Sequence, residues 1–387
     1  MNKKKEIQFN LNNFLLSVSL GLELVEKDIY KTSKNHSKRV AYLSLKIGQE
    51  YNFTPQELSD LCAYALSHNI SLKKENDYSK EHFIFAQESA DKLPFLCGYR
   101  NILKYQREYY NGSGIFGLKA DAIPLFSQII SFAHILDEKF DLSGDNIENR
   151  KGIVSFLEKK EEVLFSKDIV DKFLDASSTI DFWLDMQNEN DILYFIFASL
   201  YDFTITPTFE EVLVFTSVFD SLIEGDNDFL DKCSKMTDFY KFEHKDKQTF
   251  LIAASLYKIG KLAIPNKILE KEENLTDDEY EVVKSYPYYT KKILNNLMGF
   301  NDITNWASRI QESIDGSGYP YRLSGKQLSL KDRLMAALNV YYSLINKKPY
   351  RNAYSHEEAI KIMNKLAVES KLDASIIDDI DNQFSQL

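Results

Sequence analysis

An internal repeat limits the possible folds of this 387-residue chain more than any single segment does. Asn-Gly-Ser-Gly at residues 111–114 aligns with Asp-Gly-Ser-Gly at residues 315–318. Two further pairs of similar segments keep the same order around these sequences, namely 61–72 with 251–262 and 165–174 with 372–380. Similar segments that recur in one order are typical of a duplicated domain. We therefore predict two copies of one domain, over residues 1–204 and 205–387, packed as an internal pseudo-dimer.

The spacing of apolar residues predicts that both copies are helical. A row of apolar side chains shares one helix face in residues 40–53: Val40, Leu43, Ile47 and Tyr51. Thr54, Pro55 and Glu57 form a helix-start signature, with a capping hydroxyl, a proline at the first helical position and a glutamate three residues after the cap. Thr276 and Glu279 repeat the signature in the second copy. Because no long alternating strand pattern competes, we predict an all-α fold.

Composition and charge exclude several classes of function. The chain has 47 basic and 58 acidic residues, a net charge of −11, so we expect no binding to extended nucleic acid. Its three cysteines are widely spaced, which suits a reducing compartment. The most apolar later run, residues 192–201, is about half a membrane span, and polar residues interrupt the apolar stretch near the start of the chain. We therefore predict a cytoplasmic protein without membrane insertion.

Several motifs, taken in order, carry a family resemblance. The first copy contains His36-Ser37-Lys38-Arg39-Val40-Ala41, YALSHNISL at 64–72, His82-Phe83, Tyr105-Gln106-Arg107-Glu108 and IPLFSQIISFAH ending at His134. The second copy contains Lys258-Ile259-Gly260-Lys261 and DGSGYP at 315–320. These segments resemble the motifs HSxRVA, HDIGK, HP, HHE, DGSGYP and ARIxxVAD of the HD-GYP family, a bacterial branch of the metal-dependent HD phosphohydrolases.

The resemblance implies attack of a metal-activated hydroxide on the phosphodiester of cyclic di-GMP. In the family, at least two transition metals are bridged by a carboxylate for this step. In the first copy Asn69 stands at the position of that aspartate, and one neutral oxygen cannot bridge two cations while reducing their repulsion. Arg107 places a permanent positive charge at another ligand position. Two metals are therefore not expected in this copy.

Four of the six histidines of the chain nevertheless fall on ligand positions of the first copy: His36, His68, His82 and His134. One interpretation is a single divalent ion of iron, manganese or zinc, held by His36, His68 and His134 together with Asn69 or water. The other is that no metal cofactor binds, and that the histidines are hydrogen-bonded polar residues of a decayed cleft. The sequence leaves both interpretations open.

The second copy has lost the ligand set that the resemblance implies. Its seven ligand positions hold Cys233, Tyr257, Lys258, Tyr286, Ile310, Gln311 and Asn339. The ammonium group of Lys258 stands where the bridging carboxylate belongs, and it would repel a metal ion. We therefore predict that the second copy is not a metallohydrolase.

Other family residues are retained in the second copy: Lys261, Glu312, Asp315, Gly316, Gly318, Tyr319, Pro320 and Arg333. One interpretation is a surface for ligand binding or protein docking that outlasted catalysis. The other is a structural turn, whose glycines supply positive φ and whose proline fixes the exit of the chain. Arg107 and Lys258 also have two interpretations. They could replace the positive charge of the lost metals in a cyclic dinucleotide site. Alternatively, they pair with nearby carboxylates such as those of Glu108 and Glu312.

The function that these observations favour is regulatory. We predict a degenerate, tandem HD-GYP protein that acts without catalysis in bacterial signalling, either by docking to protein partners or by binding cyclic di-GMP. The alternative is a weak phosphohydrolase that uses one metal at His36, His68 and His134. A third hypothesis is a structural pairing module that binds no ligand.

Overall fold

The computed structural model of the chain describes residues 7–30, 33–71, 79–144, 147–224, 228–295, 297, 299–347 and 351–385. Within these residues the regular secondary structure is helical, accompanied by isolated β-bridges, and the prediction of an all-α fold is confirmed. Among the helices described, none is long and apolar enough to cross a membrane. The basic start of the sequence, residues 1–6, lies outside the described residues.

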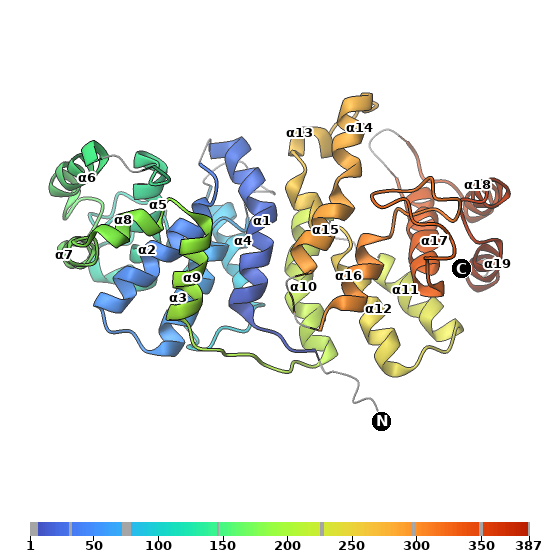
Figure 1. Cartoon of the computed structure of the whole chain (residues 1–387), viewed down its shortest axis with the longest axis horizontal. Coiled ribbons are helices and arrows are strands. Elements are labelled where there is room, and N and C mark those ends of the chain that lie inside the picture. The colour runs from blue at the N-terminus through green and yellow to red at the C-terminus, as the bar shows by residue number, and fades with distance from the viewer. Residues whose placement is uncertain are drawn as a thin grey trace. The chain divides into compact units, whose positions relative to one another are not determined.

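The chain divides into two compact units, coloured from blue to green and from yellow to red in Figure 1. The first unit is Phe9–Ile205, and the second unit is Thr206–Leu387 together with Met1–Gln8. The duplication of one domain and its packing as a pseudo-dimer stay predictions.

Helix α2 is the central helix of the first unit. The helices of this unit are α1 (Leu11–Tyr30), α2 (His36–Glu50), α3 (Pro55–Ser67), α4 (Lys80–Ala90), η1 (Ala120–Ala122), α5 (Leu125–Phe140), α6 (Ile147–Lys160), α7 (Lys167–Ala176), α8 (Ile180–Asp185) and α9 (Glu189–Ser199). Helix α2 packs against α1, α3, α5, α7 and α9. Its apolar residues Val40, Leu43 and Ile47 are fully buried, as expected for a helix that other helices enclose.

The predicted helix starts are present in both units. Thr54 accepts a hydrogen bond from the backbone N–H of Glu57, whose carboxylate accepts one from the backbone N–H of Thr54, and Pro55 occupies the first turn. Thr276 and Glu279 form the same reciprocal pair at the start of α14 (Asp277–Lys284). Because α3 begins at Pro55 and ends at Ser67, the following residue, His68, lies at its carboxyl end.

In the second unit a short helical turn packs unusually closely on a helix. Besides α14, the helices of this unit are α10 (Phe209–Glu224), α11 (Asp228–Phe239), α12 (His244–Leu256), η2 (Ile259–Ala263), α13 (Asn266–Leu269), α15 (Tyr286–Leu294), α16 (Asn301–Ser308), α17 (Leu330–Ile345), α18 (His356–Val368) and α19 (Ala374–Phe384). A Cβ atom on Gly260 of η2 would lie 2.0 Å from the carbonyl oxygen of Tyr286 and 2.4 Å from the nitrogen of Thr290. Glycine therefore allows η2 and α15 to touch, which brings Tyr286 beside the segment that carries Lys258 and Lys261.

Candidate functional site

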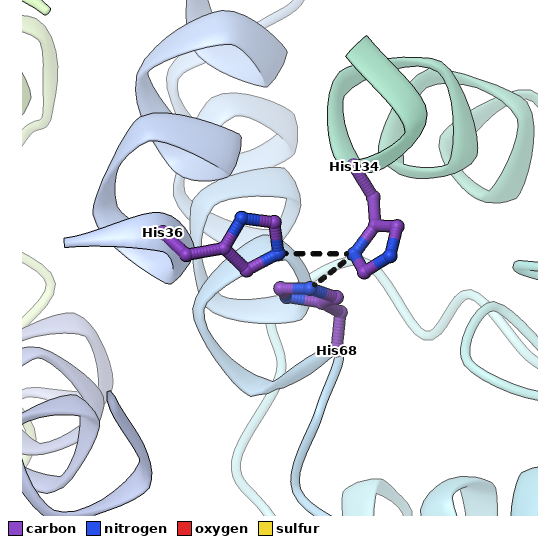
Figure 2. A group of neighbouring side chains, drawn as sticks. All are labelled: His36, His68 and His134. Atoms are coloured by element: carbon purple, nitrogen blue, oxygen red, sulfur yellow. Dashed lines mark hydrogen bonds between the residues drawn. The ribbon is translucent and has the colours of Figure 1, made fainter. Parts of the chain in front are cut away.

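Three histidines of the first unit converge on one point (Figure 2). His36 begins α2, His68 follows α3, and His134 lies within α5. His134 Nδ1 lies 3.1 Å from His36 Nε2 and 2.9 Å from His68 Nε2. All three side chains are buried, and one ring nitrogen of each lies within 4.8 Å of the other two. Because nitrogen ligands around a tetrahedral zinc ion lie about 3.3 Å apart, this group could hold one divalent ion.

The outer nitrogens of two of these rings have acceptor partners. His36 Nδ1 donates to Asp137 Oδ2 at 2.6 Å, and His68 Nδ1 donates to the carbonyl oxygen of Ala65 at 2.6 Å. A neutral imidazole with its proton on Nδ1 presents a lone pair at Nε2. Carboxylate and carbonyl partners of this kind orient the histidine ligands of metal proteins. Both Nε2 atoms therefore face the centre of the group as ligand atoms.

Asp137 is itself held by a buried arginine. Arg39 Nε lies 2.6 Å from Asp137 Oδ1 and a terminal guanidinium nitrogen lies 2.9 Å from Oδ2, and both side chains are 1% exposed. Burial alone would raise the pKa of Asp137, but the charge of Arg39 and the hydrogen bond from His36 lower it to about 2. The carboxylate is therefore charged at neutral pH and fixes the orientation of His36.

The outer face of His134 has a cationic partner. A guanidinium nitrogen of Arg107 contacts His134 Nε2, and Glu138 Oε2 lies 3.4 Å from the same atom. Since a guanidinium group only donates, this contact puts the His134 proton on Nδ1, between the acceptor nitrogens of the other two rings. Burial, followed by the charge of Arg107, lowers the pKa of His134 well below its usual range, and burial and the neighbouring His36 do the same for His68. Both rings are therefore neutral at pH 7. His134 Nδ1 could serve as a metal ligand only if its proton moved to Nε2 and the Arg107 guanidinium group no longer donated to that atom.

Two other predicted ligands lie outside the three-histidine group. Asn69 Nδ2 donates to Glu26 Oε1 at 3.0 Å, which leaves the carbonyl oxygen as the atom of this amide that can bind a metal. His82 Nε2 lies 2.9 Å from Ser71 Oγ. In the part of the chain that the structure describes, His82 does not join the cluster of ring nitrogens. The structure thus brings together three of the four predicted histidines.

Glu26 is a buried acid that no motif indicated. It lies in α1 and its side chain is fully enclosed. Its Oε1 accepts hydrogen bonds from Ser37 Oγ at 2.6 Å and Asn69 Nδ2 at 3.0 Å, and these residues directly follow His36 and His68. Its Oε2 is buried without a hydrogen-bond partner among the described residues. A carboxylate is therefore present beside residue 69, although the residue at that position is an amide.

The two glycine segments are built in the same way. Each wraps around one buried glutamate whose two oxygens accept backbone N–H groups, Glu108 from Phe116 and Leu118 at 2.6 and 2.5 Å, and Glu312 from Tyr321 and Leu323 at 2.7 and 2.8 Å. Asn111 and Asp315 each accept from the backbone N–H two residues later, at 2.9 Å. A Cβ atom on Gly114 or Gly318 would lie 2.5 Å from the Cα of the glutamate that its segment surrounds. This geometry fits the structural-turn interpretation of both segments, and Glu108 and Glu312, the alternative partners of Arg107 and Lys258, each accept two backbone N–H groups of their own segment.

Replacing Glu312 by glutamine is expected to lower the free energy of unfolding of the second unit by about 1–3 kcal/mol, because the amide nitrogen would face a buried backbone N–H. In a Trp183→Phe background, the fluorescence of Trp306 follows urea unfolding of this unit. The matched control is Glu357→Gln on the exposed side of α18, which should change the stability by less than about 0.5 kcal/mol. Equal stability of the two variants would contradict the role of Glu312 in the turn.

The second unit contains a cavity of about 570 Å³ at its predicted ligand positions. Five of those seven positions line it: Tyr257, Lys258, Tyr286, Gln311 and Asn339. Lys261 and Tyr319 line it as well. Among the described residues, six other retained family residues are not part of its lining, namely Glu312, Asp315, Gly316, Gly318, Pro320 and Arg333. Arg333 instead donates to Asp373 at 2.6 Å.

Known proteins resemble this chain, some over most of its length and others over about a third of it. It is 22% identical to 3′3′-cGAMP-specific phosphodiesterase 1 of Vibrio cholerae serotype O1, over 99% of this chain and 94% of that protein. It is 25% identical to 3′3′-cGAMP-specific phosphodiesterase 3 of the same organism, over 89% of this chain and 75% of that protein. With the cyclic di-GMP phosphodiesterase PdeB of Borreliella burgdorferi it shares 33% identity over 34% of this chain and 35% of that protein.

A solved structure matches the fold of the chain, and a domain family matches part of its sequence. The crystal structure of the cyclic GMP-AMP-specific phosphodiesterase V-cGAP3 of V. cholerae matches with a TM-score of 0.66 and 18% identity, covering 99% of both chains. Residues 215–376 match the HD domain family. The second unit therefore contains an HD domain.

The chain as a whole is homologous to the HD-GYP phosphodiesterases of cyclic dinucleotides, which confirms the resemblance that the motifs carry. This homology supports a function of the phosphodiesterase type. The family match and the three-histidine group lie in different units. The matched HD domain at 215–376 lies in the second unit, and the three-histidine group lies in the first.

Proposed function

We propose that the first unit is a single-metal phosphodiesterase centre that acts on a cyclic dinucleotide. The observation that carries this proposal is the convergence of His36, His68 and His134, two of whose outer nitrogens donate to Asp137 and to the carbonyl of Ala65. The named relatives are phosphodiesterases for 3′3′-cGAMP or cyclic di-GMP, so these two nucleotides are the first substrates to test.

The residues around the cluster favour one metal rather than two. Asn69 offers one neutral oxygen where two cations would need a bridging carboxylate. Arg107 adds a fixed positive charge on the far side of His134. Imidazole ligands suit iron, manganese and zinc. When bound, an ion of this kind would lower the pKa of a water molecule and polarise a phosphoryl oxygen.

The chain offers a buried negative charge to balance such an ion. Three neutral imidazoles do not compensate a divalent cation, and Arg39 already balances Asp137. Glu26 is buried beside Asn69, with Oε2 lacking a hydrogen-bond partner among the described residues. Because an uncompensated buried charge costs several kcal/mol, on the order of 3–5, we infer that the carboxylate of Glu26 supports the metal centre electrostatically.

The test of the proposed function is hydrolysis of 3′3′-cGAMP and of cyclic di-GMP by the full chain supplied with Fe²⁺, Mn²⁺ or Zn²⁺. We expect linear dinucleotide to form with at least one metal, and no product after chelation or in His68→Ala. A protein that binds the metal but cleaves neither nucleotide would overturn the assigned substrate. A protein that binds no metal would overturn the centre itself.

A second candidate is a non-catalytic regulator, in which a cyclic dinucleotide or a protein partner binds without chemistry. The observation that favours it is the contact of Arg107 with His134, because a guanidinium group suits a phosphate and opposes a metal ion. In this case the first unit would bind nucleotide through Arg107, and the histidines would stay hydrogen-bonded to one another.

Replacing Arg107 by methionine should separate the two candidates. A metal centre is expected to gain roughly tenfold or more in metal affinity, because charges a few ångströms apart in a partly buried site repel by about 1–4 kcal/mol. A metal-free nucleotide site should instead lose nucleotide affinity. The measurements are metal titration against a competing chelator and calorimetry with cyclic di-GMP, with the exposed Arg100→Met as control. Unchanged affinities for metal and nucleotide would contradict both roles of Arg107.

We also infer that the two units are copies of one domain. Helices α3 and α12 each have 13 residues, and they are followed by His68 and Tyr257 at matching positions. Helices α5 and α17 each have 16 residues. The buried glutamates Glu108 and Glu312 accept the same pattern of backbone hydrogen bonds in the two glycine segments. Duplication of one domain accounts for these similarities together. Unequal loss of metal ligands after the duplication accounts for the differences between the two units.

A further inference from the structure

The cavity of the second unit is large enough for a small ligand and is formed by ordered elements of the fold. Its volume of about 570 Å³ lies within the range of roughly 300–1,000 Å³ that is usual for ligand sites. Side chains from η2, α14, α15 and α17 contribute to its wall. None of the chemistry proposed above for the first unit uses these residues. The cavity is therefore a separate candidate site.

The buried part of the cavity wall is positively charged. Lys258 is 7% exposed and Lys261 is half-buried, and both line the cavity. A third lysine of the lining, Lys271, forms an ion pair with Glu279 at 2.6 Å. The acidic residues of the lining, Glu273 and Asp277, are exposed, so water and salt screen their charges more strongly than those of the buried ammonium group. The cavity wall therefore offers two lysine side chains to an anionic ligand.

Aromatic rings form much of the remaining wall. Five tyrosines line the cavity: Tyr257, Tyr280, Tyr286, Tyr319 and Tyr342. The ammonium nitrogen of Lys258 lies 5.5 Å from the ring centre of Tyr257 and 5.8 Å from that of Tyr342. Lys261 Nζ lies 5.9 Å from the ring centre of Tyr286. Aromatic side chains next to cationic groups are the arrangement that binds nucleobases by stacking and phosphates by charge.

We propose that the second unit holds a metal-independent binding site for a nucleotide ligand, in which Lys258 and Lys261 bind the phosphate and the tyrosine side chains contact the base. The proposal goes beyond the phosphodiesterase centre, because it assigns a second site with different chemistry to the other unit. Such a site binds its ligand without cleaving it, since Lys258 occupies the position at which a metal bridge would be needed. The ligand would act on the protein as an effector.

The test is calorimetry of the full chain with cyclic di-GMP, 3′3′-cGAMP and inorganic phosphate, each in the presence of excess EDTA. We expect at least one dinucleotide to bind in EDTA, and more tightly than phosphate. Loss of one charge-assisted hydrogen bond typically lowers affinity by about 10–100-fold, so Lys258→Met and Lys261→Met should each weaken binding by that factor. Lys261→Met keeps the test valid if the buried Lys258→Met variant folds poorly. Lys247→Met, whose lysine pairs with Asp238 at 2.6 Å outside the cavity lining, is the matched control and should bind like wild type.

The first-unit variant His68→Ala distinguishes this site from the phosphodiesterase centre. We expect His68→Ala to bind the dinucleotide in EDTA with unchanged affinity. Binding that disappears in EDTA or in His68→Ala, or that is unaffected by both lysine variants, would overturn the second-unit site and leave the proposed function intact. Binding in EDTA that depends on Lys258 and Lys261, in a protein without hydrolytic activity, would support this site while overturning the proposed function. Phosphate binding as tight as dinucleotide binding would overturn the role of the tyrosines.

Discussion

The metal content of the purified protein is expected to fall from about one equivalent per chain to background when His68 is replaced by alanine. His68 provides one of the three converging nitrogens, and the hydrogen bond from its Nδ1 to Ala65 already holds the ring in the required orientation. Removing an outer partner of a histidine ligand typically costs about 10–100-fold in metal affinity, so removal of the ligand itself should cost at least as much. The measurement is elemental analysis of protein prepared without added metal or chelator and under exclusion of oxygen.

His82→Ala is the matched control for this experiment. The His82 ring is buried in the same unit, but its Nε2 is hydrogen-bonded to Ser71 Oγ, outside the three-histidine group. This variant should therefore keep the metal content of wild type, whereas Asp137→Asn, which weakens the partner of His36, should give an intermediate loss. Equal metal loss in His82→Ala and His68→Ala would contradict the three-histidine centre. Wild-type protein without metal would favour the hydrogen-bonded cluster of the regulatory alternative.

The helical fold was predictable because its signals are local. The capping pairs at Thr54 and Thr276 depend on residues within four positions of one another, and the buried face of α2 follows from the spacing of its apolar residues. The homology of the chain was predictable for a related reason, since the motifs keep their order along the sequence. How side chains meet across helices is a different problem, because no local pattern encodes it.

The histidine cluster shows where this limit lies. Motif positions predicted that His36, His68 and His134 meet, yet the same positions also indicated His82, whose ring instead bonds to Ser71. Arg107 was expected in the place of a ligand, but its long side chain reaches the outer nitrogen of His134 instead. These differences arise from side-chain length and direction, which alignment to a motif does not describe.

Glu26 and the second-unit cavity were not predictable from the sequence. Glu26 meets Asn69 across 43 residues of chain, and a glutamate in a largely apolar helix gives no sign of such a contact. The cavity combines residues from 257 to 343, and its existence depends on the space that their packed side chains leave. Both features arise from tertiary packing, although the charge of the cavity comes from the motif residues Lys258 and Lys261.

Replacing Arg39 by methionine is expected to lower the free energy of unfolding of the first unit by about 3–5 kcal/mol, because it leaves the buried carboxylate of Asp137 without its cation. In a Trp306→Phe background, the fluorescence of Trp183 follows urea unfolding of this unit. The matched control is Lys167→Met, which removes an exposed pair with Asp171 in the same unit and should cost at most about 1 kcal/mol. Equal effects of the two substitutions would contradict a structural role for the buried pair.

The pH dependence of the stability difference between wild type and Arg39→Met shows whether the loss of the ion pair causes it. The pKa of Asp137 is lowered from 3.8 to about 2, so the stabilisation that its charged form gives is present above pH 4 and is lost as the pH falls through about 2. The difference between wild type and Arg39→Met should therefore shrink over that interval, because a protonated Asp137 no longer needs a cation. A loss caused by poorer packing of methionine would stay constant with pH. Since Asp137 also holds His36, a pH-dependent loss would further indicate that the ion pair which stabilises the first unit is the one that orients its metal ligand.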